Sequence, residues 1–141
     1  MRISSFLALT LIAFTTLAQA AEFNTVTVYK SPTCGCCEKY IEYLKQNGVE
    51  VSVTDVEDTA AVKAKYDVPA ALESCHTSLA NGYVIEGHVP VAAIRKLLSE
   101  GKPIRAIALP GMSVNAPGMG PMKLGTLTIY EIPKSGETPR V

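Results

Sequence analysis

The 141-residue sequence contains no tryptophan, and only 6% of its residues are aromatic. A core without large rings has to be built from aliphatic side chains, which this chain has in abundance. Its 13 basic and 13 acidic residues give a formal net charge of zero, with no basic stripe. Because nucleic-acid-binding domains usually carry such a stripe, we do not expect nucleic acid among the partners.

Beyond its first 20 residues the sequence also lacks any apolar run long enough to span a bilayer. The N-terminal stretch has one cation, Arg2, then an apolar run over residues 6–17 and the small-residue sequence AQA at 18–20. This order is typical of a secretory signal peptide, and the run is too short and too rich in threonine for a membrane span. We expect cleavage after Ala20 and an exported protein with no membrane attachment afterwards.

The remaining chain has the length of one domain. At that length it can be stable without disulfide bonds, so its four cysteines are free for chemistry. We expect a single folded domain over residues 21–133. The polar end of the chain, residues 134–141, is expected to be a flexible tail.

Hydrophobic periodicity in the first half of the domain predicts alternating strands and helices. Val26 and Val28 lie on one face of a strand, and Tyr40, Ile41 and Leu44 share a helical face. The expected elements are a strand over 25–30, a helix over 37–47, a strand over 49–54 and a helix over 60–66 capped by Asp58 or Thr59. A strand–helix–strand unit favours a right-handed crossover and a parallel pair of strands.

The second half is less regular. Its expected elements are a short helical turn over 71–80 that carries Cys75 and His76, a strand over 83–88, and a helix with Pro90 at its first position that ends at Gly101. Strands are expected over 104–109 and 127–132, the last starting near Lys123. The sequence leaves open whether 83–88 joins the central sheet or forms an insertion hairpin. If the last two strands pair antiparallel, residues 110–122 form a long hairpin loop.

Three of the four cysteines, Cys34, Cys36 and Cys37, fall between the first predicted strand and the first predicted helix. Cys34 and Cys37 have the spacing of a thioredoxin-type redox pair at a helix N-terminus. Free N–H groups and the helix dipole favour thiolate over thiol there. A thiolate attacks disulfides and also binds soft metal ions, so the pair alone fits both chemistries.

The additional thiol of Cys36 favours metal binding. An extra sulfur beside a redox pair invites scrambling, whereas a metal site gains a donor from it. Cys75 supplies a fourth sulfur, and we predict that it lies near the other three, because two sulfurs sharing one ion lie less than about 5 Å apart. Soft sulfur ligands select Cu(I). Zinc accepts four thiolates too, but has no use for methionine.

Methionines are concentrated in the predicted hairpin loop, which contains Pro110-Gly111-Met112 and Pro117-Gly118-Met119. Core filling is the ordinary role of methionine, but a loop with so much proline and glycine is expected at the surface. We therefore predict that Met112 and Met119 face the cysteine cluster and not the hydrophobic core.

Other roles compete for some of these residues. An exported protein with four cysteines most often has two structural disulfides, but a bridge within this crowded cluster closes almost no loop and stabilises little. For His76, a capping or solvent-facing role competes with metal ligation. For His88 we expect a structural hydrogen bond at a strand end, and no special role is predicted for Tyr83 or Glu86.

Three segments, CGCCEKY, SCHTSLANGYVIEGHVP and LPGMSVNAPGMG, together resemble the CopG-type copper-resistance proteins, a bacterial family of small exported metal-binding proteins. The resemblance covers roughly residues 26–132. It implies a single thioredoxin-like α/β domain in the periplasm, with a mixed sheet of four to five strands and flanking helices, that binds copper. The family's site positions fall on Cys34, Cys36, Cys37, Cys75, Met112 and Met119. Family members commonly have tryptophan shortly after the CxCC motif where this chain has Tyr40, a difference that concerns packing and not ligation.

We therefore expect a periplasmic protein that sequesters or transfers Cu(I) through cysteine thiolates and contributes to copper tolerance. The four cysteines would be primary ligands, with Met112, Met119 and His76 as further donors, and a multinuclear thiolate cluster fits this set. Expected partners are copper ions and other periplasmic copper-handling proteins. The alternative is an enzyme, a thiol–disulfide oxidoreductase with Cys34 as nucleophile and Cys37 as resolving thiol, one variant of which couples the thiols to the copper oxidation state.

Overall fold

A computed structural model of the chain describes residues 25–123, 125–134 and 137–141. The predicted signal segment, residues 1–20, lies outside the described residues. The elements in chain order are β1 (Thr25–Lys30), α1 (Gly35–Gln46), β2 (Glu50–Asp55), α2 (Thr59–Lys65), a 3₁₀ helix η1 (Ala70–Leu72), β3 (Thr77–Ala80), β4 (Tyr83–Glu86), α3 (Val91–Glu100), β5 (Ile104–Ala108) and β6 (Tyr130–Pro133). No helix in this part of the chain has the length and apolarity needed to cross a membrane.

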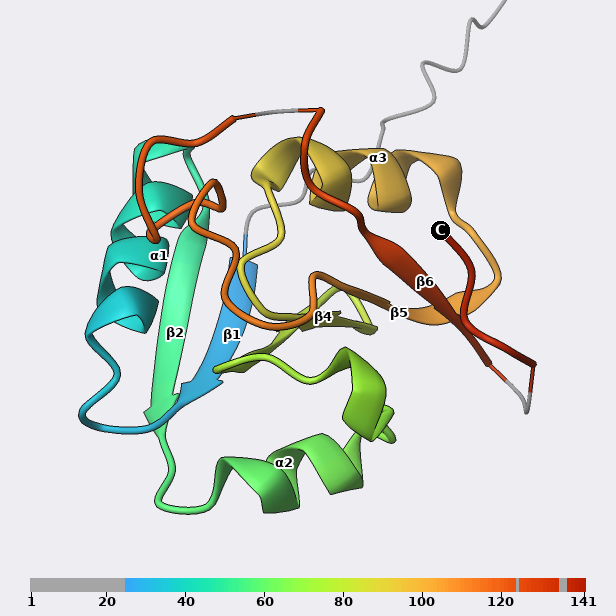
Figure 1. Cartoon of the computed structure of the whole chain (residues 1–141), viewed down its shortest axis with the longest axis horizontal. Helices are drawn as coiled ribbons and strands as arrows, with labels where there is room; N and C mark the ends of the chain where they lie inside the picture. The colour runs from blue at the N-terminus through green and yellow to red at the C-terminus, as the bar shows by residue number, and fades with distance from the viewer. Residues whose placement is uncertain (1–24, 124, 135–136) are drawn as a thin grey trace, which may run out of the picture.

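The strands form one mixed sheet in the order β2-β1-β3-β4-β5-β6 (Figure 1). β1 and β2 are parallel, as predicted, and so are β4 and β5, while the remaining neighbours are antiparallel. The α/β class with a mixed sheet is therefore confirmed. The described residues contain six strands and not the four to five expected, because β3 was not predicted.

The prediction of a helical turn over residues 71–80 is wrong for most of that segment. Only η1 is helical, Cys75 and His76 lie in the irregular segment before β3, and β3 pairs with β1 on one side and β4 on the other. The turn between β3 and β4 is Asn81-Gly82, and both residues have positive φ, as a tight two-residue hairpin turn requires. The strand conformation of residues 77–80 is therefore fixed by pairing with β1 and β4 on its two sides. Because β3 pairs with both, β4 lies inside the central sheet.

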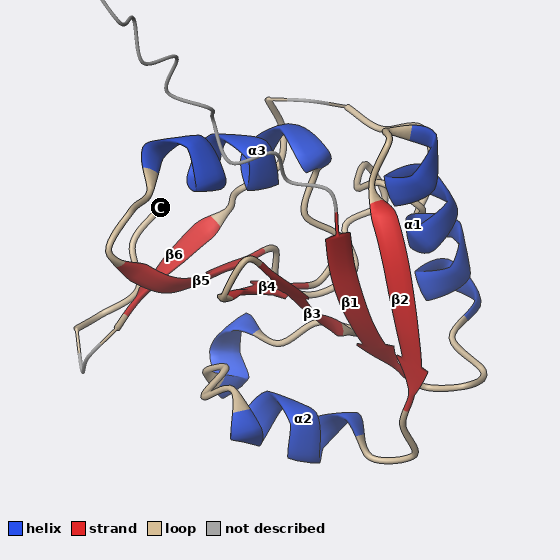
Figure 2. Cartoon of the chain, turned by 180° about the vertical axis from the view of Figure 1, so that it is seen from behind, coloured by secondary structure: helices blue, strands red, loops and turns tan. Residues whose placement is uncertain are grey.

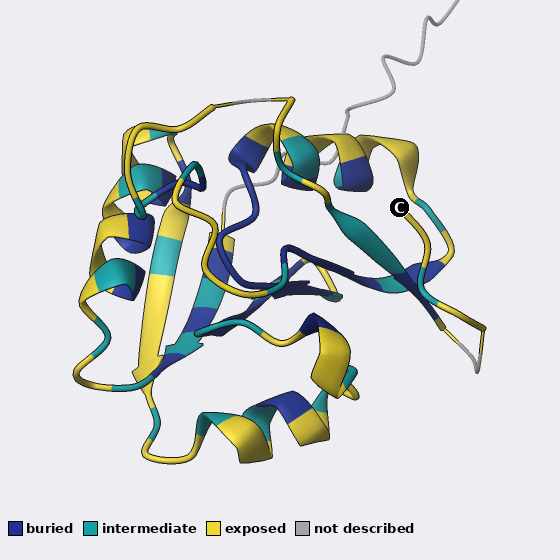
Figure 3. Ribbon diagram, in the orientation of Figure 1, coloured by how far each residue is buried: buried dark blue, intermediate teal, exposed yellow. Residues whose placement is uncertain are grey.

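The two faces of the sheet are covered by different helices. Figures 1 and 2 show α3 on one side of the central strands and α2 on the other. Alternate side chains of the inner strands follow this division. Ile85 and Ile107 join the main core with α1 and α3, whereas Val84 and Ala106 join a second core with residues that follow α2. Figure 3 shows the resulting pattern, with helices buried along their inner sides and exposed along their outer sides.

The long loop between β5 and β6 lies against α1. β5 and β6 pair antiparallel, so the condition for the predicted hairpin connection is met. β6, however, begins at Tyr130 and not near residue 123 or 127 as expected. The apolar residues before it, Leu127 and Ile129, pack against the main core from outside the strand.

The end of the chain runs beside β6. Arg140 and Glu131 exchange two backbone hydrogen bonds and form an isolated antiparallel bridge. The flexibility expected of residues 134–141 stays a prediction.

Candidate metal centre

The turn after β1 brings three cysteines to the N-terminus of α1. Cys34 is the N-cap residue, and Cys36 and Cys37 belong to the first helical turn, as predicted. Cys37 is fully buried, while Cys34 and Cys36 are partly exposed. Since the first N–H groups of a helix have no partners within the helix, this end offers a positive field to sulfur anions.

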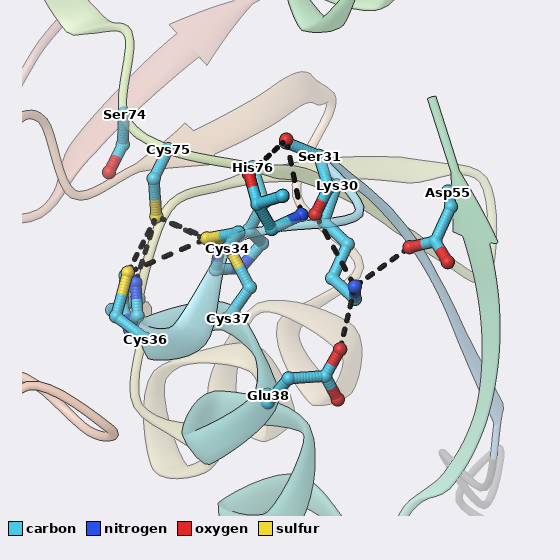
Figure 4. The surroundings of a disulfide bond; sticks show 12 residues. Lys30, Ser31, Cys34, Cys36, Cys37, Glu38, Asp55, Ser74, Cys75 and His76 are labelled. Atoms are coloured by element: carbon cyan, nitrogen blue, oxygen red, sulfur yellow. Dashed lines mark hydrogen bonds and ion pairs between the residues drawn. A yellow bond between two sulfur atoms is a disulfide. The ribbon is translucent and has the colours of Figure 1, made fainter. Parts of the chain in front are cut away.

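The irregular segment before β3 brings Cys75 against the same helix end (Figure 4). Its Sγ lies 3.9 Å from that of Cys36 and 3.8 Å from that of Cys37, and Cys34 Sγ lies 3.6 Å from Cys36 Sγ. All four sulfur atoms lie within 4.8 Å of one another. The prediction that Cys75 approaches the CGCC cluster closely enough to share an ion is therefore confirmed.

Cys34 and Cys37 are joined by a disulfide bond, and Cys36 and Cys75 are free thiols. Burial, and next the neighbouring Cys36, raises the pKa of Cys75 to about 12. Its sulfur therefore keeps its proton near neutral pH, and an ion that binds there has to displace that proton. Four thiolates become available only after two electrons reduce the disulfide.

Two histidines complete the immediate surroundings of Cys75. His88 Nε2 lies 2.9 Å from Cys75 Sγ and His76 Nδ1 lies 3.3 Å from it, and both rings are buried. His88 Nδ1 lies 2.6 Å from the carbonyl oxygen of Pro117. A carbonyl only accepts, so Nδ1 carries the proton and Nε2 presents its lone pair to the sulfur. Burial lowers the pKa of both histidines, and the neighbouring His88 lowers that of His76 further.

His88 is a site residue that the sequence reasoning missed. The structural hydrogen bond expected of it exists, but the same ring also contacts Cys75. The signal was the β3–β4 hairpin, whose register pairs Thr77 with Glu86. Continued by two residues past the strand ends, this register places Cys75 opposite His88. Without β3 in the prediction, that relation could not be seen.

The buried carboxylate of Glu86 holds the chain on both sides of Cys75. Its Oε1 accepts hydrogen bonds from the Ser74 amide at 2.7 Å and from Lys63 Nζ at 2.6 Å, and its Oε2 accepts one from the Thr77 hydroxyl at 2.6 Å. The side chains of Lys63, Thr77 and Glu86 are almost wholly buried. No special role was predicted for Glu86, and no local sequence pattern indicates that a lysine of α2 pairs with it.

The start of the long loop between β5 and β6 also holds the Cys75 segment, through hydrogen bonds near the surface. The Ser74 hydroxyl donates to the Gly111 carbonyl at 2.5 Å, and the Gly111 amide donates to the Glu73 carbonyl at 3.0 Å. Gly87 permits this close packing, because a Cβ there would lie 2.6 Å from Ser74 Cβ and 2.5 Å from the Leu109 carbonyl oxygen. The Cys75 segment and the beginning of the methionine loop are therefore directly connected.

Tyr40 packs beneath both histidines. Its ring centroid lies 4.7 Å from that of His76 and 5.1 Å from that of His88, and its hydroxyl donates to the Val89 carbonyl at 2.8 Å. Complete burial raises the pKa of the hydroxyl, so it stays protonated as a donor. The Tyr40 ring therefore packs against both imidazoles and limits their movement.

The two predicted methionine donors have different surroundings. Met112 is 60% exposed. Met119 is partly buried and packs against the main core, so the expectation that it would avoid the core is wrong. The cause is Gly118, which lies so close to α1 that a Cβ on it would be 2.6 Å from the Tyr40 backbone nitrogen. The ligand roles of Met112 and Met119 stay predictions.

Comparison with known families divides the chain at η1, after α2. Residues 26–69 match the glutaredoxin family, and residues 72–119 match a family described as "Protein of unknown function, DUF411". No curated protein sequence matches the chain significantly. Two solved structures of "Copper resistance protein copG", forms 2 and 1, are each 36% identical to the chain. They superpose with TM-scores of 0.73 and 0.72, covering 82% of this chain and 94% and 93% of theirs.

The fold and the four clustered sulfurs first define a class, a thioredoxin-like domain with a cysteine site able to hold a metal ion. At this identity and coverage the relationship is also specific. The chain belongs to the CopG family of copper resistance proteins, as the resemblance of its three segments indicated. Its role is therefore related to copper.

Proposed function

We propose that this protein binds Cu(I) in the periplasm, sequesters or transfers it, and thereby contributes to copper tolerance. The observation that carries the proposal is the gathering of Cys34, Cys36, Cys37 and Cys75 within 4.8 Å of one another from two segments far apart in sequence. Thiolates are the ligands that Cu(I) prefers. Family membership supports copper as the metal.

The spacing of the sulfurs suits ions bridged by thiolates. Metal–thiolate bonds of about 2.3 Å place two sulfurs on one ion no more than about 4.6 Å apart. The separations of 3.6, 3.8 and 3.9 Å in the structure lie inside that limit. Because each thiolate has several lone pairs, the reduced site can hold more than one Cu(I). Loading requires that the disulfide gain two electrons and that each bound thiol release its proton.

The proposed location depends on export by the N-terminal segment, after which the metal would come from and pass to other copper-handling proteins of the periplasm. His76 is one further donor beside the cysteines, since its Nδ1 lies 3.3 Å from Cys75 Sγ. Met112 and Met119 would be secondary donors. A thioether needs no deprotonation, so it suits the entry and exit of Cu(I).

The proposal is tested by replacing Cys36 with serine. We expect the reduced, anaerobic Cys36→Ser protein to bind at most about half as much Cu(I) as wild type, because a hydroxyl is a poor ligand for a soft ion. Thr33→Ser, at an exposed position of the same turn, is the matched control and should bind the wild-type amount. Copper per protein is measured by elemental analysis after gel filtration. Wild-type binding by the Cys36→Ser protein would contradict the proposal.

The methionine donors make a kinetic prediction. Met112→Leu combined with Met119→Leu should preserve the fold, since leucine is similar in size and apolarity. The copper stoichiometry should also be unchanged, while Cu(I) transfer to a chelator, followed by stopped flow, should become slower. Met122→Leu, at another exposed methionine of the loop, serves as the control. Equal transfer rates in all three proteins would leave the methionines as ordinary packing residues.

A thiol–disulfide oxidoreductase is the second candidate, favoured by the Cys34–Cys37 disulfide and the glutaredoxin match. The free thiols are poorly placed for exchange with that bond. An S–S bond is about 2 Å long, so in-line attack on Cys37 from Cys75 at 3.8 Å would put the attacking sulfur about 5.8 Å from Cys34. The actual separation is within 4.8 Å. An exchange enzyme that uses Cys34 and Cys37 should keep full exchange activity in the Cys36→Ser protein. A four-thiolate copper site should instead lose much of its bound copper in that protein.

A further inference from the structure

We infer that Cys75, His76 and His88 form a second metal-binding set, which takes a divalent ion of the zinc class while Cys34 and Cys37 are joined as a disulfide. The set shares Cys75 with the proposed Cu(I) site but needs neither disulfide-bonded sulfur. It supplies two imidazole nitrogens and one thiolate, whereas the proposed Cu(I) site is mainly sulfur, with His76 as its one nitrogen donor. The oxidation state of the Cys34–Cys37 pair would thus decide which kind of ion the protein binds.

The three donor atoms are already gathered. Ligand atoms of Cys75, His76 and His88 lie within 4.8 Å of one another. Around a tetrahedral zinc ion, with bonds of about 2.3 Å to sulfur and 2.05 Å to nitrogen, sulfur and nitrogen lie about 3.6 Å apart. The two sulfur–nitrogen distances here are 2.9 and 3.3 Å. An ion would therefore lengthen these two distances by about 0.3 and 0.7 Å, a change within reach of small side-chain rotations.

His88 has the arrangement of a preformed ligand. Its Nδ1–H donates to the Pro117 carbonyl, which fixes the ring orientation and the tautomer and leaves Nε2 unprotonated beside Cys75. Metal-binding histidines almost always donate their second ring nitrogen to a carboxylate, a backbone carbonyl or water in this way. The carbonyl comes from the long loop, so the orientation of His88 is imposed by a segment 29 residues away.

His76 supplies an independent indication. Its ring is completely buried, yet Nε2 has no hydrogen-bond partner among the described residues. Leaving a buried polar nitrogen unpaired costs about 1–3 kcal/mol, and the one hydrogen-bond contact of this ring within the described part of the chain is that of Nδ1 with Cys75 Sγ at 3.3 Å. Tyr40 and His88 pack against the ring and hold it beside Cys75. Nδ1 faces Cys75 Sγ, so it is the nitrogen through which His76 would bind the ion.

The chemistry of the donor set selects the ion. Two neutral imidazoles and one thiolate suit Zn²⁺, which commonly takes three protein ligands and keeps a fourth position for water. Cys36 Sγ, 3.9 Å from Cys75 Sγ, lies beside the set. On binding, the S–H bond of Cys75 breaks, its proton passes to solvent, and a metal–sulfur bond forms. Both imidazoles bind through lone pairs, and no electron is transferred.

The test uses Co²⁺ as a spectroscopic substitute for zinc. Purified protein with the Cys34–Cys37 disulfide intact, confirmed by counting two free thiols, is titrated with Co²⁺ without oxygen. We expect one equivalent to produce a thiolate-to-cobalt band in the near ultraviolet and tetrahedral d–d bands in the visible, and Zn²⁺ to abolish both. Absence of these bands from protein with both free thiols present would overturn the inference.

Variants separate this set from the copper site. His88→Gln and His76→Gln should each weaken Co²⁺ binding at least about tenfold. Cys36→Ser should change it less than tenfold while lowering Cu(I) binding by the reduced protein. If the cobalt bands survive His88→Gln, or disappear in Cys36→Ser, the ion is not held by this set. A failure of Cu(I) binding in reduced wild type would contradict the proposed function alone and leave the cobalt result standing.

A measurement on the wild-type protein tests the same ligands without any substitution. Ring-nitrogen NMR of ¹⁵N-histidine-labelled protein should show Nε2 of His88 and one nitrogen of His76 shifting when Zn²⁺ is added, in slow exchange and saturating at one equivalent. The chain has only two histidines, so assignment is direct. Unchanged ring nitrogens in the presence of bound zinc would overturn the inference.

Discussion

At the scale of single residues, the metal centre depends on glycines that let separate segments approach closely. Gly118 packs on the backbone of α1, and Gly87 packs between Ser74 and Leu109. Both have positive φ, so both requirements, space and backbone conformation, exclude other residues. The carbonyl that orients His88 belongs to Pro117, the residue before Gly118. The position of that imidazole therefore depends on Gly118, which acts on it only through the backbone of the neighbouring Pro117.

Gly118→Ala should destabilise the fold and displace the Pro117 carbonyl from His88. Gly125→Ala is a matched control, because Gly125 has the same φ of 78° but nothing within 4 Å of the added Cβ. Each substitution incurs a backbone cost of about 1–3 kcal/mol, and only Gly118→Ala adds a clash with Tyr40. Urea denaturation should show a lower free energy of unfolding for Gly118→Ala than for Gly125→Ala. Equal losses would mean that α1 and the loop separate easily.

At the scale of elements, one buried ion pair connects α2 with the Cys75 segment. Lys63 Nζ lies 2.6 Å from Glu86 Oε1, and both side chains are at least 95% buried. Glu86 in turn accepts hydrogen bonds from Ser74 and Thr77, on either side of Cys75. A buried pair of this kind contributes little net stability against an apolar replacement, but losing one partner leaves a charge without compensation.

Lys63→Met should therefore be strongly destabilising, by about 3–5 kcal/mol, because the Glu86 carboxylate would remain buried and unpaired. Lys65→Met, at an exposed position of the same helix, is the control and should change stability by less than about 0.5 kcal/mol. Urea denaturation of both variants measures the difference. If Lys63→Met proves as mild as Lys65→Met, Glu86 is protonated or hydrated and does not fix the Cys75 segment through this pair.

At the scale of the whole molecule, two neutral histidines are enclosed between the sheet, α1 and the long loop. Burial lowers the pKa of both His76 and His88 below the ordinary value of about 6.5. The unfolded chain therefore binds more protons than the native protein once the pH falls below about 6.5. The free energy of unfolding should be largest above this pH and should fall as the pH decreases through it.

Metal-free protein should accordingly lose stability between pH 7 and pH 5.5, by at most about 1.4 kcal/mol per pH unit for each histidine. His76→Gln should have a smaller slope of stability against pH than wild type, because one of the two groups that must stay neutral is gone. Urea denaturation at several pH values provides the slopes. Parallel slopes for the two proteins would show that His76 accepts its proton without unfolding.

The sequence by itself determined what local periodicity and residue chemistry can specify. The alternation of Val26 and Val28, and the shared face of Tyr40, Ile41 and Leu44, predicted β1 and α1, and the element order predicted an α/β fold with a parallel first pair. The spacing of Cys34, Cys36 and Cys37 also predicted a sulfur cluster at a helix N-terminus, because neighbours in sequence are neighbours in space there.

Only the tertiary structure decided which distant groups meet. β3 was missed because its extended conformation comes from pairing on both sides, and the contact between Cys75 and His88 was missed with it. Met119 was expected away from the core, yet the approach of the loop to α1 places it there. The Lys63–Glu86 pair joins a helix to a strand 23 residues away. Such contacts depend on how finished elements pack, so no local pattern in the chain records them.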